Sequence, residues 1–447
     1  MDTMWDQRAE RMSADERADL QSTRLDGLVG RLAERSPRYR ERLAGVGVGP
    51  GARVGLDGLA DLPFTTKQDL WDAYPWGLLA VPREQVVRVH GSSGTGGRPT
   101  LVAYSRADLG IWAEVCARAL GCASATAGTI VHNAYGYGLF TGGLGMHAGA
   151  ELMGCTLVPV SGGQTQRQVT LVRDLQPEIL CCTPSYAARL GEALAEAGMA
   201  KDDISLRVGI FGAEPWTEAM RAQIEALLPL RAIDIYGLSE IIGPGVACEC
   251  VEAQAGLHVN EDHFLVEVVD PGSGRPLPPG ERGELVFTTL TKEAMPLLRY
   301  RTGDIASLDR SACACGRTLA RMSKVTGRRD DMLVIRGVNV YPSEVEAVLV
   351  AERAVAPHYL LVVDRTGTMP RLVVACELAA GWTICAETEE AERERVAGEM
   401  GAALLQRLGL ATEVRVLPAG AIPRVELGKA KRVVQRTVED NPLPGWL

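Results

Sequence analysis

The sequence contains no long apolar run. No window in its 447 residues approaches the roughly 20 consecutive apolar residues that a helix needs to cross a bilayer. Residues 1–20 are rich in Asp, Glu and Arg and hold no apolar stretch, so we expect neither a signal peptide nor a membrane anchor. These absences predict a cytoplasmic protein without a membrane partner.

Basic residues are outnumbered by acidic ones. The chain has 47 Lys and Arg against 56 Asp and Glu, which gives a net charge of −9. Proteins that bind nucleic acid or anionic membranes rely on clustered Lys and Arg. The charge balance therefore argues against a nucleic acid as a partner, and an acidic small ligand would need a local positive charge.

The cysteine content argues against a disulfide scaffold. The 11 cysteines are an odd number in a long chain for which we expect no export signal, and this fits reduced thiols in a cytosol. Hydrophobic residues make up 46% of the chain and charged residues 23%, which is an ordinary globular composition. A chain of this length is expected to form about two to four folding units.

Apolar periodicity predicts helices first, and then strands that alternate with helices. Near the N-terminus, Leu25, Leu28 and Leu32 recur at helical spacing among Arg and Glu. Between Val86 and Leu290, short apolar runs alternate with helix-like stretches. The runs are 128–132, 156–160, 179–182, 208–211 and 232–236. Such alternation predicts parallel βαβ units and the α/β fold class.

The last part of the chain has a different pattern. Residues 264–270 and 283–289 are predicted to be hairpin strands on either side of a Pro-rich turn, and a charged stretch at 327–331 has the composition of a hinge. A small unit follows, with helices and strands expected at 342–350, 358–363, 371–378, 389–408 and 413–417. We therefore predict a large N-terminal domain of mixed α/β layers, residues 1–329, and a small α+β C-terminal domain, residues 330–447.

The most informative segment is glycine-rich and reads Gly91-Ser92-Ser93-Gly94-Thr95-Gly96-Gly97. Glycines let backbone N–H groups approach an anion closely, and hydroxyl groups donate further hydrogen bonds, so such a loop can bind phosphate. Composition alone leaves an ordinary turn equally open. The loop is not a Walker A motif, because no Gly-Lys-Ser/Thr follows at the required spacing.

Together with later segments, this loop resembles the signature motifs of the acyl-adenylate-forming superfamily. The later segments are Tyr236-Gly237-Leu238-Ser239-Glu240, Arg299-Tyr300-Arg301-Thr302-Gly303-Asp304, Gly327-Arg328-Arg329-Asp330-Asp331 and Pro423-Arg424-Val425-Glu426-Leu427-Gly428-Lys429. Within the superfamily, residues 62–67, 133–138 and 331–342 are most similar to the phenylacetate-CoA ligase family. The resemblance spans nearly the whole chain and implies the adenylate-forming enzyme fold.

The resemblance implies an ATP-dependent acid-thiol ligase. Such an enzyme activates an aryl carboxylic acid as acyl-AMP with ATP and Mg²⁺, and then transfers the acyl group to coenzyme A. No Asp emerges that would pair with the ammonium group of an amino acid, so an aryl acid is favoured. Relatives that resemble this chain are often dimers, which makes a homodimer an expectation.

Two alternatives stay open at this point. The acceptor could be the phosphopantetheine thiol of a carrier protein, so that the chain is a stand-alone enzyme that loads an aryl or amino acid. A nucleotide-binding protein without turnover is the other alternative. It is motivated by Gly96, which stands where the family usually has a second Thr, so one hydrogen bond to phosphate is lost.

The resemblance also implies two catalytic residues. Glu240 would hold Mg²⁺ through its carboxylate, a hard oxygen ligand, and the competing interpretation is a surface carboxylate. Lys429 would reach the acyl carboxylate and the α-phosphate when the small domain closes. The competing interpretation of Lys429 is one more Lys in a basic C-terminal run. Asp330 is the implied hinge residue about which the small domain turns.

A nucleotide site and an acyl pocket follow from the same motifs. The implied ATP- and AMP-binding residues are Ser92, Ser93, Gly94, Thr95, Gly96, Gly97, Ala213, Glu214, Pro215, Tyr236, Gly237, Ser239, Asp304 and Arg328. Asp304 would bind the ribose hydroxyls, with a turn Asp as the alternative, and a hinge salt bridge is the alternative for Arg328. The implied acyl pocket, for which ordinary core is the alternative, consists of Tyr135, Gly136, Phe140, Ala213 and Pro244.

A second constellation has the residue types of a zinc site. Zinc prefers four thiolate or imidazole ligands in a tetrahedron, and paired cysteines around a Gly turn supply them. We predict a structural Zn²⁺ on Cys250, His258, Cys313 and Cys315, with Cys248 as a substitute ligand if His258 faces away. Free cysteines in turns are the alternative.

Overall fold

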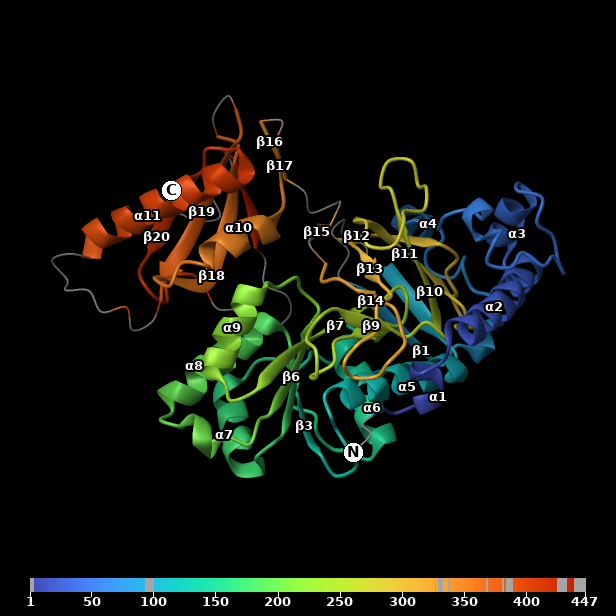
Figure 1. Cartoon of the computed structure of the whole chain (residues 1–447), viewed down its shortest axis with the longest axis horizontal. Coiled ribbons are helices and arrows are strands. Elements are labelled where there is room, and N and C mark those ends of the chain that lie inside the picture. Colours follow the sequence, from blue (N-terminus) through green and yellow to red (C-terminus); the bar gives the residue numbers. More distant parts are fainter. Residues whose placement is uncertain are drawn as a thin grey trace. The chain divides into compact units, whose positions relative to one another are not determined.

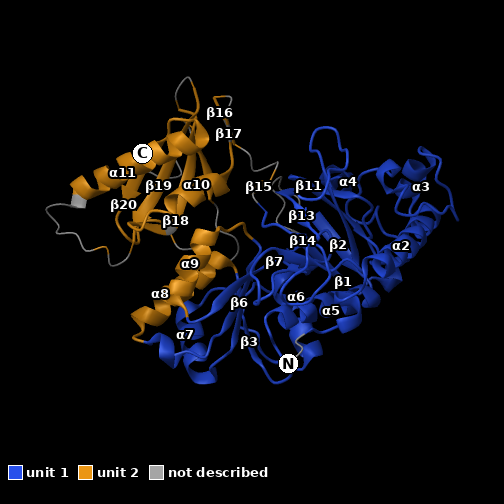
Figure 2. Ribbon diagram, in the orientation of Figure 1, with its two compact units in different colours: residues 1–182, 199–213, 229–325 blue, residues 183–198, 214–228, 326–447 orange. Residues whose placement is uncertain are grey.

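A computed structural model describes most of the chain. The described residues are 4–92, 100–325, 327–328, 333–336, 338–366, 369–379, 382, 389–423 and 432–437. The chain forms two compact units (Figures 1 and 2). The first unit comprises residues 1–182, 199–213 and 229–325, and the second comprises residues 183–198, 214–228 and 326–447. Among the described residues, no helix combines the length and the apolar character needed to cross a bilayer.

The N-terminal segment is helical, as its leucine spacing predicts. The helices are α1 (Gln7–Glu10), α2 (Ala14–Arg35) and α3 (Pro37–Ala44). The start of α2 is fixed by a capping box, in which the Ser13 hydroxyl accepts from the Glu16 amide and the Glu16 carboxylate accepts from the Ser13 amide. Leu25, Leu28 and Leu32 are buried in the core of the first unit.

A nine-stranded sheet, counted within the described residues, organises the first unit. Its strands lie in the order β13 (Leu308–Asp309), β14 (Arg321–Met322), β9 (Leu257–Val259), β8 (Gly243–Cys248), β7 (Arg231–Leu238), β6 (Val208–Gly212), β5 (Ile179–Cys182), β3 (Ile130–Asn133) and β4 (Thr156–Val158). From β4 to β7 the pairing is parallel, and from β7 to β13 it is antiparallel. The predicted parallel strands are therefore confirmed.

The parallel strands are buried because helices pack on the sheet. All residues of β5 and β6 are buried, as expected for strands that are covered on both faces. The covering helices include α5 (Arg106–Cys122), α6 (Gly142–Met153) and α7 (Thr165–Leu175). Of these, α5 and α6 pack against each other and against β8.

Smaller sheets complete the first unit. The predicted hairpin is confirmed as β10 (Phe264–Val269) paired antiparallel with β11 (Gly283–Thr289), which also pairs antiparallel with β12 (Tyr300–Ala306). The strands β1 (Arg88–Ser92) and β2 (Thr100–Tyr104) form an antiparallel pair on either side of the glycine-rich loop. Short helices occupy the segment before β1, namely η1 (Leu59–Asp61), α4 (Lys67–Asp72) and η2 (Arg83–Gln85).

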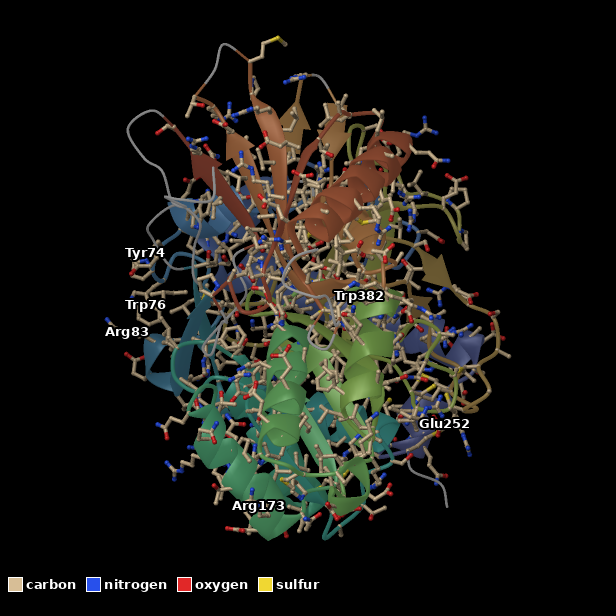
Figure 3. All side chains as sticks on the ribbon, turned by 90° about the vertical axis from the view of Figure 1, so that its left-hand side faces the viewer. Tyr74, Trp76, Arg83, Arg173, Glu252 and Trp382 are labelled. Atoms are coloured by element: carbon tan, nitrogen blue, oxygen red, sulfur yellow. The ribbon has the colours of Figure 1, made fainter. Side chains whose placement is uncertain are left out.

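One surface contact fixes the approach to β1. The Arg83 guanidinium lies over the Trp76 ring, 5.0 Å from its centroid, and Tyr74 lies in the same surface region (Figure 3). A cation on the face of an indole is a favourable contact that also covers apolar surface. This contact between two side chains stabilises the conformation of the segment between α4 and β1.

The second unit has its own sheet and core. Its elements are α8 (Pro184–Glu196), α9 (Glu218–Leu227), β15 (Gly327–Arg328), β16 (Leu333–Ile335), β17 (Val338–Val340), α10 (Pro342–Leu349), β18 (Val355–Asp364), β19 (Arg371–Leu378), α11 (Glu389–Leu408), β20 (Glu413–Leu417) and β21 (Val433–Arg436). Within the described residues, one sheet has the order β20, β19, β18, β21. Leu361 and Val374 of this sheet share a core with Val396 and Leu404 of α11. The α+β pattern expected after the hinge is confirmed, and the boundary between residues 329 and 330, both outside the described residues, stays a prediction.

Candidate active site and metal-binding group

The carboxyl ends of the parallel strands bring several predicted residues to one edge of the large sheet. Tyr135 follows β3, Ala213 follows β6 directly, and Tyr236 and Gly237 lie in the last part of β7. The pairing of β3, β5, β6 and β7 places these ends side by side. Ligands of α/β proteins bind at this edge of the sheet.

Two glycines allow the backbone to pass closely at this edge. A Cβ atom on Gly212 would lie 2.2 Å from the carbonyl oxygen of Ile235, and one on Gly237 would lie 1.8 Å from that of Gly243. No side chain can be accommodated at such distances. Ala213 has φ +71°, a left-handed conformation that is uncommon for a residue with a Cβ atom. The backbone at the ends of β6 and β7 is therefore held in one tight arrangement.

Tyr236 and Asp304 contact each other directly. The Tyr236 hydroxyl donates to Asp304 Oδ2 at 2.6 Å, and both side chains are buried. The Tyr236 ring stacks on Phe287 with centroids 5.9 Å apart. Asp304 lies in the middle of β12, so its interpretation as a turn residue is wrong. Two residues that the sequence predicts to bind the nucleotide are thus joined by a direct hydrogen bond.

The turn between β7 and β8 carries the next predicted residues. Ser239 Oγ lies 3.1 Å from Thr141 Oγ1, so the two hydroxyls share a hydrogen bond. Glu240 is 5% exposed, and its interpretation as a surface carboxylate is wrong. The role of Glu240 in holding Mg²⁺ stays a prediction.

The predicted acyl-pocket residues lie close to the same turn. Pro244 stands opposite Gly237 in the β7–β8 pairing. The Pro244 carbonyl accepts a hydrogen bond from Trp112 Nε1 at 3.2 Å, which fixes this segment to α5. The Tyr135 hydroxyl donates to the Ile210 carbonyl at 3.3 Å, and burial raises the pKa of Tyr135 well above its usual range. The Tyr135 hydroxyl is neutral and already hydrogen-bonded, so Tyr135 could contribute an aromatic ring to a pocket but no charge.

Gly136 and Phe140 frame the start of α6. The Gly136 carbonyl accepts from the Gly143 amide at 3.1 Å. The Phe140 ring covers Gly142, where a Cβ atom would lie 2.6 Å from the ring. The role of these residues in binding an acid stays a prediction.

The remaining predicted residues lie elsewhere or outside the described part of the chain. Glu214, Pro215 and Arg328 belong to the second unit, where Glu214 Oε1 accepts from the Ser185 amide at 2.8 Å in the first turn of α8. The Ser92 backbone ends β1. The loop residues Ser93, Gly94, Thr95, Gly96 and Gly97, the hinge residue Asp330 and Lys429 lie outside the described residues.

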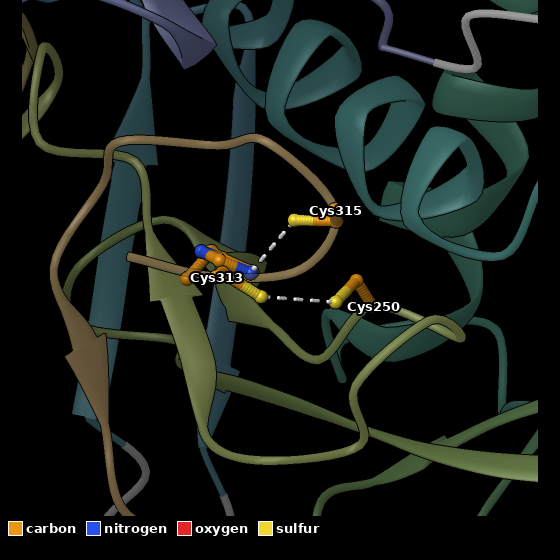
Figure 4. Close-up of side chains that lie close together, drawn as sticks. Cys250, Cys313 and Cys315 are labelled. Atoms are coloured by element: carbon orange, nitrogen blue, oxygen red, sulfur yellow. Dashed lines mark hydrogen bonds between the residues drawn. The ribbon is translucent and has the colours of Figure 1, made fainter. Parts of the chain in front are cut away.

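The four predicted zinc ligands lie together (Figure 4). One ligand atom from each of Cys250, His258, Cys313 and Cys315 lies within 4.8 Å of the other three. Cys250 Sγ is 3.7 Å from Cys313 Sγ, and Cys315 Sγ is 3.4 Å from His258 Nε2. The pairing of β9 with β14 brings His258 next to the loop that carries Cys313 and Cys315.

This group fits a tetrahedral metal ion. Three thiols and one imidazole form a donor set that zinc prefers. Hydrogen bonds from Cys250 and His258 lower the pKa of Cys315, and the same contact with Cys315 raises the pKa of Cys250. The Cys248 thiol instead lies 4.0 Å from the Ala119 carbonyl and does not belong to the group.

A second group of acidic and histidine side chains does not fit a cation. Glu114, Asp262 and His263 bring their ligand atoms within 4.8 Å of one another. The Arg118 guanidinium, however, makes hydrogen bonds of 2.8 and 2.9 Å to the two carboxylate oxygens of Asp262 and also bonds Glu114. A positive charge already occupies the place that a cation would take, so this group is an ion-pair network.

Sequence patterns did not predict the partners that hold the site in place. Tyr104, Thr141 and Lys292 contact the turn after β7, yet they come from β2, from the start of α6 and from the segment after β11. Each lies outside the recognised motifs. The signal available for Lys292 was its place in the run 288–296, between the motifs at 236–240 and 299–304.

Comparison with known proteins identifies both parts of the chain. The family model described as AMP-binding enzyme matches residues 68–290, and the one described as AMP-binding enzyme C-terminal domain matches residues 337–437. Phenylacetate-coenzyme A ligase of Thermus thermophilus is 53% identical over 428 residues, which cover 93% of this chain and 95% of that protein. The protein of the same name from Escherichia coli K12 is 48% identical over 426 residues, covering 95% and 96%.

Solved structures show the same fold. The structure of 2-hydroxyisobutyryl-CoA ligase in the postadenylation state, in complex with R3-HIB-AMP, matches with a TM-score of 0.89 and 27% identity, and covers 97% of this chain and 92% of that one. The same ligase with 2-HIB-AMP and CoA in the thioesterification state matches with a TM-score of 0.72 and 28% identity, covering 98% and 93%. The predicted adenylate-forming fold, with a large N-terminal and a small C-terminal domain, is confirmed.

Proposed function

Because this chain belongs to the phenylacetate-coenzyme A ligase family of AMP-binding enzymes, we propose that it activates an aryl carboxylic acid as acyl-AMP and transfers the acyl group to coenzyme A. The observation that carries this proposal is an identity of about half over nearly the full length of relatives that bear that name. The hydrogen bond between Tyr236 at the end of β7 and Asp304 on β12, and the position of Glu240 in the turn that follows β7, support it.

The first half-reaction joins the acid to AMP. A carboxylate oxygen of the acid attacks the α-phosphorus of ATP, and the bond to pyrophosphate breaks. Asp304 accepts from the ribose hydroxyls, and the loop 92–97 donates to the phosphates. Glu240 would hold Mg²⁺, an ion that neutralises negative charge on the phosphates. Lys429 adds a positive charge at the attacking carboxylate and the α-phosphate.

The second half-reaction transfers the acyl group. The thiolate sulfur of coenzyme A attacks the acyl carbonyl carbon, and the bond to AMP breaks. We propose that the small domain turns about Asp330 between the two steps, so that Lys429 leaves and the thiol enters. The solved structures of 2-hydroxyisobutyryl-CoA ligase in a postadenylation and a thioesterification state support such a change in a relative.

The acid is proposed to be aromatic and the acceptor to be coenzyme A. The rings of Tyr135 and Phe140, with Gly136, Ala213 and Pro244, supply flat and small walls that suit an aryl group. The named relatives are coenzyme A ligases, which favours this acceptor over a carrier protein. We also propose a structural Zn²⁺ on Cys250, His258, Cys313 and Cys315, for which metal analysis of the purified protein is the direct test.

A panel of acids tests the proposed function. Benzoate, phenylacetate, hydroxybenzoate and aminobenzoate are each incubated with ATP and Mg²⁺, with coenzyme A, with a phosphopantetheine carrier protein or with neither. We expect acid-dependent pyrophosphate release with at least one aryl acid, and a thioester only when coenzyme A is present. Release without any acid dependence, or thioester formation on the carrier protein alone, would overturn the proposal.

A further inference from the structure

The turn Ser239–Ile242 is held from outside the hairpin that it closes. It joins β7 to β8 and carries Glu240 and Ser239. Its last two amides both donate to the Leu238 carbonyl oxygen at 3.1 Å. Those two donors are therefore satisfied within the hairpin, and the carbonyl groups of the turn are left to find other partners.

Two side chains supply these partners. The Tyr104 hydroxyl lies 3.1 Å from the carbonyl oxygen of Ile242, the last residue of the turn, and 3.4 Å from that of the first residue. Lys292 Nζ donates to the carbonyl oxygens of the two middle residues, Glu240 at 3.1 Å and Ile241 at 2.7 Å. All four consecutive carbonyl oxygens thus lie within hydrogen-bonding reach of one tyrosine and one lysine.

Lys292 is buried at a substantial energetic cost. Its side chain is 1% exposed, and Tyr104 is fully buried. Burial lowers the pKa of Lys292 to about 8, yet the ammonium group still predominates at neutral pH. Two carbonyl oxygens and the Tyr104 ring, whose centroid is 5.0 Å from Nζ, compensate for the lost hydration. Lys292 Nζ thus donates to two carbonyl oxygens of one turn, and the Asp108 and Glu240 carboxylates also favour its charged form, so these contacts fix the conformation of that turn.

The backbone on both sides of this contact is also fixed. The amides of Glu293 and Ala294 donate to the Asp108 carboxylate at 2.6 and 3.0 Å, and Asp108 is fully buried in the first turn of α5. The same turn begins at Ser105, which follows Tyr104 directly and forms a capping box with Asp108. Lys292 and Tyr104 therefore both extend from backbone segments that are fixed by hydrogen bonds to Asp108.

We propose that Lys292, together with Tyr104, is a positioning residue that holds the turn Ser239–Ile242 so that the Glu240 carboxylate faces the metal-bound nucleotide. Neither side chain touches substrate in this proposal, and both act through the backbone of the turn. The proposal rests on the proposed function, because it assigns to Glu240 the magnesium role given above. It adds to that function the two residues that set the position of the Glu240 carboxylate.

The test compares the folded variants Lys292→Met and Lys292→Arg with the wild type. We expect Lys292→Met to raise the Mg²⁺ concentration for half-maximal acid-dependent pyrophosphate exchange by about tenfold, which corresponds to one lost charged hydrogen-bond set. The KM for the aryl acid should stay within about twofold, since no acyl contact changes. Lys292→Arg should restore part of the Mg²⁺ response, and Lys201→Met, at an exposed position, serves as the matched control.

Hydrogen exchange provides a readout that does not depend on activity. Amides of 239–242 should exchange about tenfold faster in Lys292→Met than in the wild type, because the turn opens more readily. If Lys292→Met does not fold, Tyr104→Phe removes a single hydroxyl and should shift both readouts in the same direction by about threefold.

The outcomes separate this proposal from the proposed function. Unchanged exchange in the turn overturns the positioning role, whatever the activity. Faster exchange with an unchanged Mg²⁺ response reduces Lys292 to a structural residue and also overturns it. If the wild type shows no acid-dependent exchange of pyrophosphate, the proposed function fails. The positioning of Glu240 for Mg²⁺ then fails with it, even if hydrogen exchange shows that Lys292 stabilises the turn.

Discussion

At the scale of single residues, the hydrogen bond between Tyr236 and Asp304 explains how the carboxylate that we propose to bind the ribose is kept in place. Asp304 is buried on β12, and Tyr236 on β7 donates to one of its oxygens at 2.6 Å. This hydrogen bond limits the rotation of the Asp304 carboxylate. A buried acceptor held in this way costs less reorganisation when a ligand hydroxyl arrives.

Removal of this hydroxyl should weaken nucleotide binding. We expect Tyr236→Phe to raise the KM for ATP by about two- to tenfold, the range for one hydrogen bond of about 0.5–1.5 kcal/mol. Tyr359→Phe is the matched control, because the Tyr359 hydroxyl also donates to a buried carboxylate, that of Glu346, at 2.6 Å. Both variants should lose similar thermal stability, but only Tyr236→Phe should change the KM. Equal KM values in the two variants would contradict this role.

The sequence predicted residue identities at the site better than their contacts. Tyr236, Glu240 and Asp304 stand in ordered motifs, so their types and spacing were sufficient to propose them as site residues. Their partners Thr141 and Lys292 come from distant segments, and only the folded chain brings them to the turn. Neither residue belongs to a periodic pattern, and the burial of each depends on packing that a local pattern does not contain.

At the scale of elements, the loop between β13 and β14, which carries two of the proposed zinc ligands, also holds the N-terminal helix. Arg317 Nε donates to Glu10 Oε2 at 2.5 Å, and both side chains are 1% exposed. The Thr318 amide donates to the Glu10 carbonyl at 3.0 Å, and Arg17 donates to the Thr318 carbonyl at 3.1 Å. The loop that carries Cys313 and Cys315 is therefore the support on which α1 and the start of α2 rest.

Loss of the proposed zinc should destabilise both the loop between β13 and β14 and the N-terminal helix α1. Because metal binding contributes directly to folding, we expect a strong chelator or Cys250→Ser to lower the melting temperature by several degrees. Proteolytic cleavage near Glu10 should also become faster, since its anchoring loop relaxes. Cys376→Ser, at a buried cysteine of β19 outside the group, is the control that should leave cleavage unchanged. A protein that contains no metal as purified, or one that is equally protected with and without the chelator, would refute the prediction.

The ion-pair network between α5 and the segment before β10 predicts the response to acid. Burial by itself would raise the pKa of Asp262, but His263 and Arg118 outweigh it and lower the pKa to about 2. His263, whose Nε2 lies 3.6 Å from Glu114 Oε1, together with Arg118 lowers the pKa of Glu114 to about 2. Both pKa values lie below those of the unfolded chain, so the network stabilises the protein fully above about pH 4 and loses this effect as the pH falls toward 2.

The variant Arg118→Met tests this dependence by urea unfolding at several pH values. At neutral pH it should reduce the free energy of unfolding by about 3–5 kcal/mol, because buried carboxylates are left without their partner. The difference from the wild type should shrink between pH 4 and pH 2, where the carboxylates of the wild type take up protons. A difference that stays constant over this range would mean that packing, rather than charge, sets the contribution of Arg118.

Regular elements were predicted well because their signals are local. The buried runs of β5 and β6 and the leucine spacing of α2 appear directly in the sequence. Membership of α8 and α9 in the second unit has no such signal. Both helices have one apolar face, and a hydrophobic period shows that a face is buried without showing which element covers it.

At the scale of the whole molecule, two chemical steps have to share one chain. The first step needs positive charge at the carboxylate and the α-phosphate, and the second needs room for a thiol at the same carbonyl carbon. Since a lysine and a thiol cannot occupy one place, we propose that a change of domain position resolves the conflict. The C-terminal family match at 337–437 includes Lys429, which is the charge that this scheme assigns to the first step.

The scheme predicts that Lys429→Ala separates the two half-reactions. Acid-dependent pyrophosphate exchange should fall by at least about a thousandfold, as expected when a charge acting in the transition state is removed. Thiolysis of a supplied acyl-adenylate by coenzyme A should stay within about threefold of the wild type, because the lysine has left the site in that step. Lys431→Ala, two positions further along the same basic run, is the matched control and should preserve both rates. Equal loss of both half-reactions in Lys429→Ala would show that one arrangement serves both steps, and the turn about Asp330 would then have no role.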